Sequence, residues 1–172
     1  SYRTTLYERL LLVDELLRSS TAGLDTANAR GMAPLRAQIL SRLGALSPGE
    51  RTFRSLNLEL PSGQSMSVIG QGVAVYPLSP DALIHLGKGE PVLLFRPAPE
   101  GAARILVVRA LDPRTPEQGV MTAEVNPSFL WGDRQDMPYN TMFCVLSAGS
   151  YQPLYCPAPQ QAGSIREAIA AS

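Results

Sequence analysis

The sequence predicts an α+β domain in which two helices precede an antiparallel sheet. Apolar residues recur at helical spacing before Thr52, and the period changes to two from Thr52 onward. Short strand-like runs then follow one another with turns between them, which is the α+β pattern. The 172 residues, 45% of them hydrophobic, can bury one core. We therefore expect a single domain, with a helical lead-in at 1–50, a sheet core at 51–157 and a C-terminal connection at 158–172.

The first expected helix runs from Tyr2 to Ala22. Its apolar residues recur at steps of four, three and four, at Leu6, Leu10, Val13 and Leu17. This spacing is typical of a seam that contacts another element. The seam packs either on the domain's own sheet or on a second copy of the helix, as a dimer surface. The spacing favours the first reading, and both stay open at this point.

A second helix is expected from Ala33 to Leu46, and Ser47-Pro48-Gly49 would end it. A hairpin should follow, because Leu56, Leu58 and Leu60 alternate with Ser55, Asn57 and Glu59. Its turn falls at Pro61–Gln64 and its second strand at Ser65–Ile69. The alternation predicts a hairpin with one face buried and one face exposed to water.

Ser79 as N-cap, Pro80 at the first helical position and Asp81 in the first turn predict a short helix that ends after Leu86. Glycines at 87 and 89 would stop it. Further strands are predicted at Val92–Arg96, Arg104–Leu111 and Gly119–Val125.

Asn126-Pro127 repeats the cap-plus-proline signal and predicts a single helical turn through Trp131. A last hairpin is expected from Thr141–Ser147 and Tyr151–Cys156. A final helix at Gly163–Ala171 would close the chain. Together these segments give a meander with short helices inserted.

The residue types that catalysis and metal binding require are scarce. His85 is the single histidine, and its short helix indicates a partly exposed structural role. Gly70-Gln71-Gly72 lacks the third glycine and the following helix of a phosphate loop, so a turn or bulge explains it better. Asp133 and Asp136 are too few oxygen ligands for a calcium site. We therefore expect no catalytic residues, no metal and no cofactor.

Charge excludes another class of partner. Fifteen basic and fifteen acidic residues leave no net charge, and they are scattered along the chain. A nucleic-acid surface would need a basic stripe. We therefore expect no nucleic-acid partner.

Candidate ligand residues gather after the predicted turn at Trp131. Aromatic and polar side chains of the kind that line small-molecule pockets occur there together, at Phe129, Trp131, Arg134, Asp136, Tyr139 and Asn140. The alternative is that Trp131 is a core anchor that plugs the end of the sheet, and the sequence favours that reading for this side chain.

Cys144 and Cys156 fall on the two arms of the last predicted hairpin, at an even separation. A disulfide between them is geometrically feasible if the turn sets them opposite one another. A bridge would indicate an oxidising compartment, whereas two buried thiols would leave the compartment open.

The order of several segments resembles the extracytoplasmic Cache-like (PAS-like) sensor domains of bacterial membrane-bound diguanylate cyclase and phosphodiesterase signalling proteins. The resemblance covers Ser79 to Cys156, and the leading helices match in kind. The segments that carry it are Ser79–Leu83, Gly89–Leu94, Arg109–Pro113, Glu124–Gly132, Phe143–Leu146 and Leu154–Cys156.

The resemblance implies a periplasmic domain between two membrane helices outside this chain, led in by a long juxtamembrane helix and dimerising through it. Its partner would be a small-molecule ligand or a periplasmic protein, and any output enzyme would lie elsewhere. The tyrosine, arginine and tryptophan signature of amino-acid-binding Cache domains is not recognisable, so no ligand residues are carried over. The start at Ser1 lacks an initiator Met, and no apolar run approaches the roughly 20 residues of a membrane span, so we expect an excised domain. The alternative function is a non-catalytic envelope assembly module.

Overall fold

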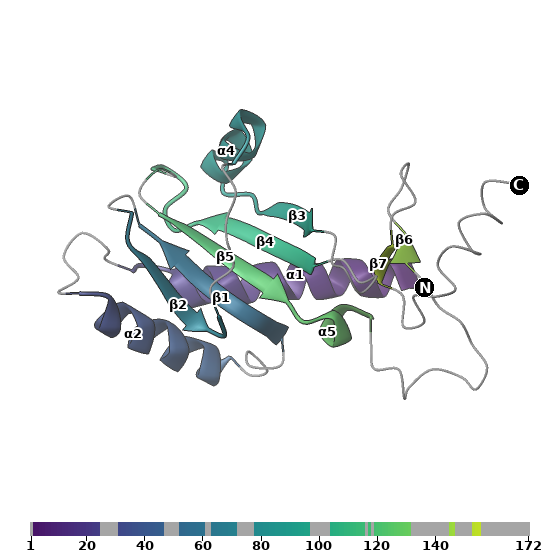
Figure 1. Ribbon diagram of the computed structural model, residues 1–172, viewed down its shortest axis with the longest axis horizontal. Helices are drawn as coiled ribbons and strands as arrows, with labels where there is room; N and C mark the ends of the chain where they lie inside the picture. The colour runs from purple at the N-terminus through teal and green to yellow at the C-terminus, as the bar shows by residue number, and fades with distance from the viewer. Residues whose placement is uncertain are drawn as a thin grey trace, which may run out of the picture.

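A computed structural model of the chain describes residues 2–24, 31–46, 52–60, 63–71, 78–96, 104–115, 117, 119–131, 145–146 and 153–155. Within these residues a five-stranded antiparallel sheet is accompanied by several helices (Figure 1), so the predicted α+β class is confirmed. In chain order the elements are α1 (Tyr2–Thr21), α2 (Met32–Ala45), β1 (Phe53–Glu59), β2 (Ser65–Ile69), α4 (Pro80–Gly87), β3 (Val92–Arg96), β4 (Arg104–Ala110), β5 (Val120–Val125), α5 (Pro127–Trp131), β6 (Val145–Leu146) and β7 (Pro153–Tyr155).

The strands of the larger sheet lie in the order β2-β1-β5-β4-β3. The predicted hairpin of β1 and β2 is present, and β3 to β5 form the predicted meander. β1 also pairs with β5, which places Leu56 opposite Ala123. This long-range pairing puts β5 at the centre of the sheet, between the first strand of the chain and β4.

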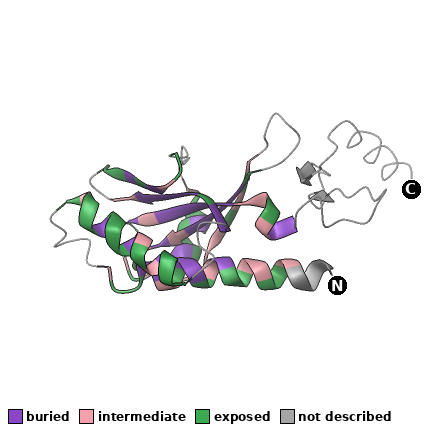
Figure 2. Cartoon of the chain, turned by 90° about the horizontal axis from the view of Figure 1, so that it is seen from below, coloured by how far each residue is buried: buried purple, intermediate pink, exposed green. Residues whose placement is uncertain are grey.

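One face of the sheet, the helix-side face, packs on α1 and α2. Figure 2 shows the buried side of α1 turned toward the sheet. The core between them is apolar, because alternate residues of β1 and β5 meet the buried sides of both helices. It includes Val13, Leu17, Leu35, Ile39, Leu43, Phe53, Leu56, Leu58, Met121, Ala123 and Val125.

The seam of α1 is part of this core. Val13 and Leu17 are fully buried in it, and Leu6 and Leu10 are partly buried against it. Val13 and Leu17 therefore pack on the domain's own sheet, as the first of the two readings expects, whereas a dimer contact at the partly buried Leu6 and Leu10 stays a prediction. The N-terminal turns of α1 run past the end of the sheet (Figures 1 and 2).

The opposite face of the sheet, called the outer face below, carries α4. Ser79 caps this helix as predicted, with its Oγ accepting a hydrogen bond from the Ala82 N–H at 3.1 Å. Leu86 is fully buried in a small cluster with Val108 and Ala110 of β4. α4 thus covers one part of the outer face.

The last predicted hairpin is present in part, since β6 and β7 pair antiparallel with Val145 opposite Tyr155. Cys144, Cys156 and the helix expected at Gly163–Ala171 lie outside the described residues. Among the helices that the structure does describe, none combines the length and the apolar character needed to cross a membrane.

Candidate functional site

The middle of the outer face is buried and polar. Ser55 and Asn57 of β1 and Thr122 and Glu124 of β5 are 3%, 5%, 1% and 2% exposed, respectively. The sequence predicted that the polar face of the β1–β2 hairpin is exposed to water, and for Ser55 and Asn57 this is wrong. Period-two alternation identifies residues that share a face, but it carries no information about what covers that face.

The ladder register assembles these four residues into one patch. Ser55 lies directly opposite Glu124, and Asn57 directly opposite Thr122. Side chains opposite one another on the same face stand about 5 Å apart at Cβ. The patch therefore spans the two central strands of the sheet.

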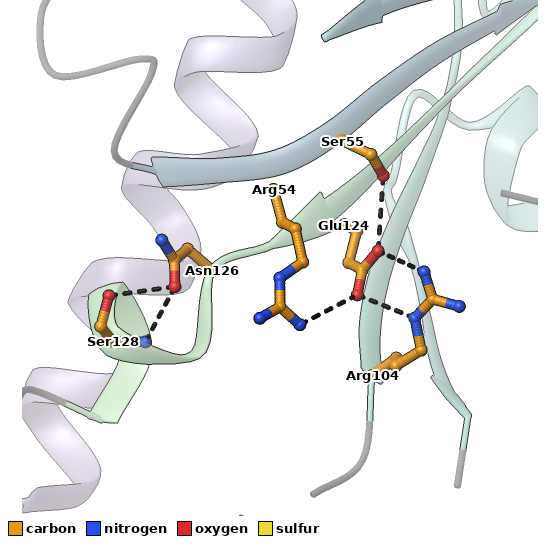
Figure 3. Close-up of polar contacts among 6 residues, drawn as sticks. All are labelled: Arg54, Ser55, Arg104, Glu124, Asn126 and Ser128. Carbon is orange, nitrogen blue, oxygen red and sulfur yellow. Dashed lines mark hydrogen bonds and ion pairs between the residues drawn. The ribbon is translucent and has the colours of Figure 1, made fainter. Parts of the chain in front are cut away.

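Glu124 is the buried charge of the patch, and two arginines and a serine surround it (Figure 3). Arg104 of β4 donates two hydrogen bonds, from Nε to Oε1 at 2.8 Å and from Nη2 to Oε2 at 2.6 Å. Ser55 Oγ lies 3.5 Å from Oε2, and Arg54 Nη1 lies 3.9 Å from Oε1. Paired, charge-assisted hydrogen bonds are strong and directional. They raise the pKa of the Arg104 guanidinium and fix the carboxylate in one orientation.

The arginines lie on the solvent side of this carboxylate. The Arg54 side chain is 62% exposed and that of Arg104 is 45% exposed, whereas the Glu124 side chain is 2% exposed. The cluster therefore presents positive charge to the solvent and holds its negative charge beneath. Its guanidinium groups could bind an anionic group of a ligand.

Arg54 owes its position to a β-bulge. In the β1–β5 ladder Phe53 faces Val125 and Ser55 faces Glu124, so Arg54 is the extra residue. Bulges of this kind re-aim a side chain. Gly70, at φ +65°, allows β2 to approach there, since a Cβ at this position would lie 2.5 Å from the Arg54 carbonyl oxygen. Only glycine readily adopts this positive φ and also has no Cβ to collide with the Arg54 carbonyl oxygen.

Thr122 gives the patch an unpaired polar group. Its Oγ1 is buried and makes no hydrogen bond within the described part of the chain. The neighbouring Asn57, by contrast, accepts a hydrogen bond on Oδ1 from Ser67 Oγ at 3.0 Å. A buried hydroxyl without a partner costs about 1–3 kcal/mol. A bound molecule or water that supplied the partner would recover that free energy.

The ligand residues predicted from the sequence are only partly described. Phe129 and Trp131 lie on α5, with Trp131 buried in the helix-side core and Phe129 packed against it. This placement fits the alternative reading of Trp131 as a core anchor. Arg134, Asp136, Tyr139 and Asn140, like Asp133, lie outside the described residues, so a role for them stays a prediction.

Local contacts explain how α5 reaches the core. Asn126 Oδ1 accepts hydrogen bonds from the Ser128 N–H at 3.2 Å and from Ser128 Oγ at 3.0 Å, as Figure 3 shows. This cap is the one that Asn126-Pro127 predicted. From α1, Arg9 Nη1 donates to the Leu130 carbonyl oxygen at 2.9 Å. The cap and this bond hold the end of β5 against the lead-in helix.

His85 plays no part in the patch. It lies exposed on α4, where its Nδ1 is 2.7 Å from Glu90 Oε2. That hydrogen bond lowers the pKa of the exposed Glu90 carboxyl group. This is the structural role that the sequence indicated for the only histidine.

Sequence reasoning missed the residues that form the patch, chiefly Arg54, Arg104, Thr122 and Glu124. One signal was available, because Glu124 is a lone charge in a predicted strand that is otherwise mostly apolar. Charged residues are almost never fully buried unless they are paired. A glutamate in the central strand therefore implied a partner on a neighbouring strand, although not which one.

In the comparisons with known proteins, the chain matches no family model and no curated protein.

Proposed function

We propose that the chain is the extracytoplasmic sensory domain of a transmembrane signalling protein, which binds a small ligand on the outer face. A cytoplasmic output module, such as a diguanylate cyclase, would lie outside this chain and would carry any enzymatic activity. The antiparallel sheet with a helix packed along one face supports the resemblance to PAS-like sensors. The observation that carries the proposal is the buried polar patch with the unpaired hydroxyl of Thr122.

Signal transmission would run through β4, which has contacts on both faces of the sheet. Arg104 binds Glu124 on the outer face, and Arg109 Nη1 donates to Asp14 Oδ1 of α1 on the helix side at 2.8 Å. A ligand can shift the equilibrium between two positions of α1 only by the difference between its binding free energies for the two arrangements of these contacts. β4 is thus a direct path from the patch to α1.

The contact between α1 and β4 includes a largely buried ion pair, because the Arg109 and Asp14 side chains are 11% and 20% exposed. Burial raises the pKa of the Asp14 carboxyl group, and the nearby Arg109 only partly offsets this. Burial likewise lowers the pKa of the Arg109 guanidinium more than Asp14 raises it. Because desolvation opposes the charge on both partners, the free energy of this ion pair depends on how closely α1 packs on β4.

A thermal-shift screen tests the proposal. The domain would be melted with amino acids, organic acids, nucleotides and uncharged polyols, and at least one class should raise the melting temperature. A ligand at 100 times its Kd stabilises the folded state by about 2.7 kcal/mol. The absence of a shift with every class would contradict ligand sensing and favour the second candidate.

That second candidate is a non-catalytic envelope module that binds another protein. It is favoured by Leu93 and Phe95, which lie two residues apart on the helix-side face of the edge strand β3 and are 42% and 50% exposed. Leu83 and Ile84 of α4 are exposed as well, on the other side of the sheet. Exposed apolar groups of this kind are typical of protein contacts. This second candidate predicts that no small molecule in the screen raises the melting temperature.

We also propose that the domain forms a homodimer through the exposed side of α1 instead of the buried seam. Tyr7 and Leu11, one turn apart, are 63% and 52% exposed. Light scattering of the wild type and of Leu11→Asp would test this. The wild type should be dimeric and the variant monomeric, and a monomeric wild type would exclude the dimer for the isolated domain.

A further inference from the structure

We propose that the ligand of the outer face is a small organic anion, whose carboxylate or phosphate group binds Arg54 and Arg104 while a second polar group bonds Thr122 Oγ1. This inference rests on the proposed sensory function and specifies its ligand class. It follows from the charge, the free donors and the spacing of the patch.

The charges around Glu124 leave a positive surplus. Two guanidinium groups, from Arg54 and Arg104, face one carboxylate, and the Arg54 contact is long at 3.9 Å. An anion bound here would balance the second guanidinium group, whereas a cation would add to the positive charge.

Arg54 and Arg104 have N–H groups that Glu124 does not occupy and that could donate to such an anion. Arginine has five N–H groups in a planar fork. Glu124 occupies the Nε and Nη2 edge of Arg104, and the described residues supply no acceptor for Nη1. Arg54 reaches Glu124 through Nη1 alone, at a distance beyond hydrogen-bond length. The fork geometry matches the paired oxygens of a carboxylate or phosphate.

Thr122 sets the approximate size of the ligand. It lies two residues before Glu124 on the same face of β5, and same-face residues two apart are separated by about 7 Å. Arg54 and Arg104 lie beyond Glu124 as seen from Thr122, so a ligand whose anionic group lies at the arginines would need a second hydrogen-bonding group at least about that far away. Extended dicarboxylates of four or more carbons approach this length, whereas α-hydroxy acids and α-amino acids, whose two polar groups sit on adjacent carbons, are too short.

Matched compounds test the charge requirement. Calorimetric titration of the domain would compare succinate with its uncharged diamide, with inorganic phosphate as a second oxyanion. Succinate, phosphate or both should bind, the diamide should not, and binding should weaken as salt is raised. Arg54→Gln should weaken anion binding roughly tenfold, the effect expected for a lost charged contact. Arg114→Gln, at a side chain 93% exposed, is the matched control and should bind like the wild type.

Thr122→Val tests the contact between the ligand's second polar group and Thr122 Oγ1, because valine has nearly the same shape as threonine and lacks the hydroxyl group. It should weaken succinate binding roughly tenfold while leaving the melting temperature of the free domain unchanged or higher, because it removes a buried unpaired hydroxyl. Thr122→Ser should retain binding.

Two results would overturn the inference while leaving ligand sensing intact. One is binding by uncharged or cationic compounds alone, and the other is anion binding that neither Arg54→Gln nor Thr122→Val alters. Binding by no compound of any class would instead contradict the proposed function itself.

Discussion

Along the strands β1 and β5, the two faces of the sheet are buried alike but differ in chemistry. On the helix-side face β1 and β5 contribute Leu56 and Ala123, both fully buried among apolar residues. On the outer face the same strands contribute Ser55, Thr122 and Glu124, which are buried to nearly the same extent. Apolar burial stabilises the fold, whereas buried polar groups cost free energy unless they are fully paired. The difference indicates that the helix-side face stabilises the fold, and that the outer face retains groups suited to recognition.

The largest effect is expected from placing a charge in the helix-side core. In Val13→Asp a fully buried side chain of α1 would become a carboxylate without a partner. The cost should exceed about 4 kcal/mol, a large part of the stability of an ordinary domain. Circular dichroism and urea denaturation should show a largely unfolded protein at 25 °C.

Leu12→Asp is the matched control on the same helix, because Leu12 is 43% exposed and is not one of the two side chains placed at the proposed dimer surface. It should change the free energy of unfolding by no more than about 0.5 kcal/mol. If both variants unfolded equally, α1 would not pack on the sheet as described. If Val13→Asp stayed folded and only lost self-association, the seam would be a dimer surface after all.

A smaller effect is expected on the outer face, from Arg104→Met. The change removes both hydrogen bonds to a carboxylate that stays buried. Removing one partner of a buried ion pair costs about 3–5 kcal/mol. Since Arg104 is itself nearly half exposed, the expected loss is about 2–3 kcal/mol. Urea denaturation at neutral pH measures it.

The double variant Arg104→Met with Glu124→Gln identifies the cause of that loss. Neutralising the buried group should recover more than half of the lost stability, because the penalty comes from an unpaired charge. Arg114→Met provides a control for removing an exposed arginine. No recovery in the double variant would mean that Arg104 stabilises the sheet by packing its side-chain stem and not by pairing Glu124.

Sequence reasoning predicted the helix-side face well and the outer face poorly. Spacing alone identified the helix over 33–46, the strands and the caps at Ser79 and Asn126, because these depend on local propensity and periodicity. The coarse α+β class followed from their order. The pairing of β1 with β5 brings together residues far apart in the sequence, and no local pattern specifies it.

The candidate site depends on that non-local pairing. Ser55 meets Glu124 only because β1 lies beside β5, and Arg54 is the extra residue of a bulge in that pairing, beside which Gly70 allows close approach of the chain. Of the six residues that the sequence offered as ligand contacts, Trp131 is buried in the helix-side core and Phe129 packs against it, and the other four lie outside the described residues. Composition identifies types of residue, whereas the site depends on register.

The smallest effect concerns a polar contact on the otherwise apolar helix-side face, between Asp14 and Arg109. The folded-state pKa of Asp14 is raised above its ordinary value of 3.8 by burial. As pH rises past 3.8, the unfolded chain releases this proton before the folded chain does. The contribution of Asp14 to stability is therefore complete below about pH 3.8 and is lost as pH rises through the raised pKa.

Asp14→Asn should remove this pH dependence. The other carboxyl groups are common to both proteins, so the difference between their free energies of unfolding isolates Asp14. Relative to the wild type, the variant should be more stable at pH 6.5 than at pH 3.5. In an Arg109→Gln background the contribution of Asp14 to the free energy of unfolding should be lost over a range that extends to higher pH. The reason is that the guanidinium group that lowers the pKa of Asp14 is gone. A difference curve of opposite slope would mean that the attraction of Arg109 outweighs the effect of burial on the pKa of Asp14, so that the charged carboxylate stabilises the contact between α1 and β4.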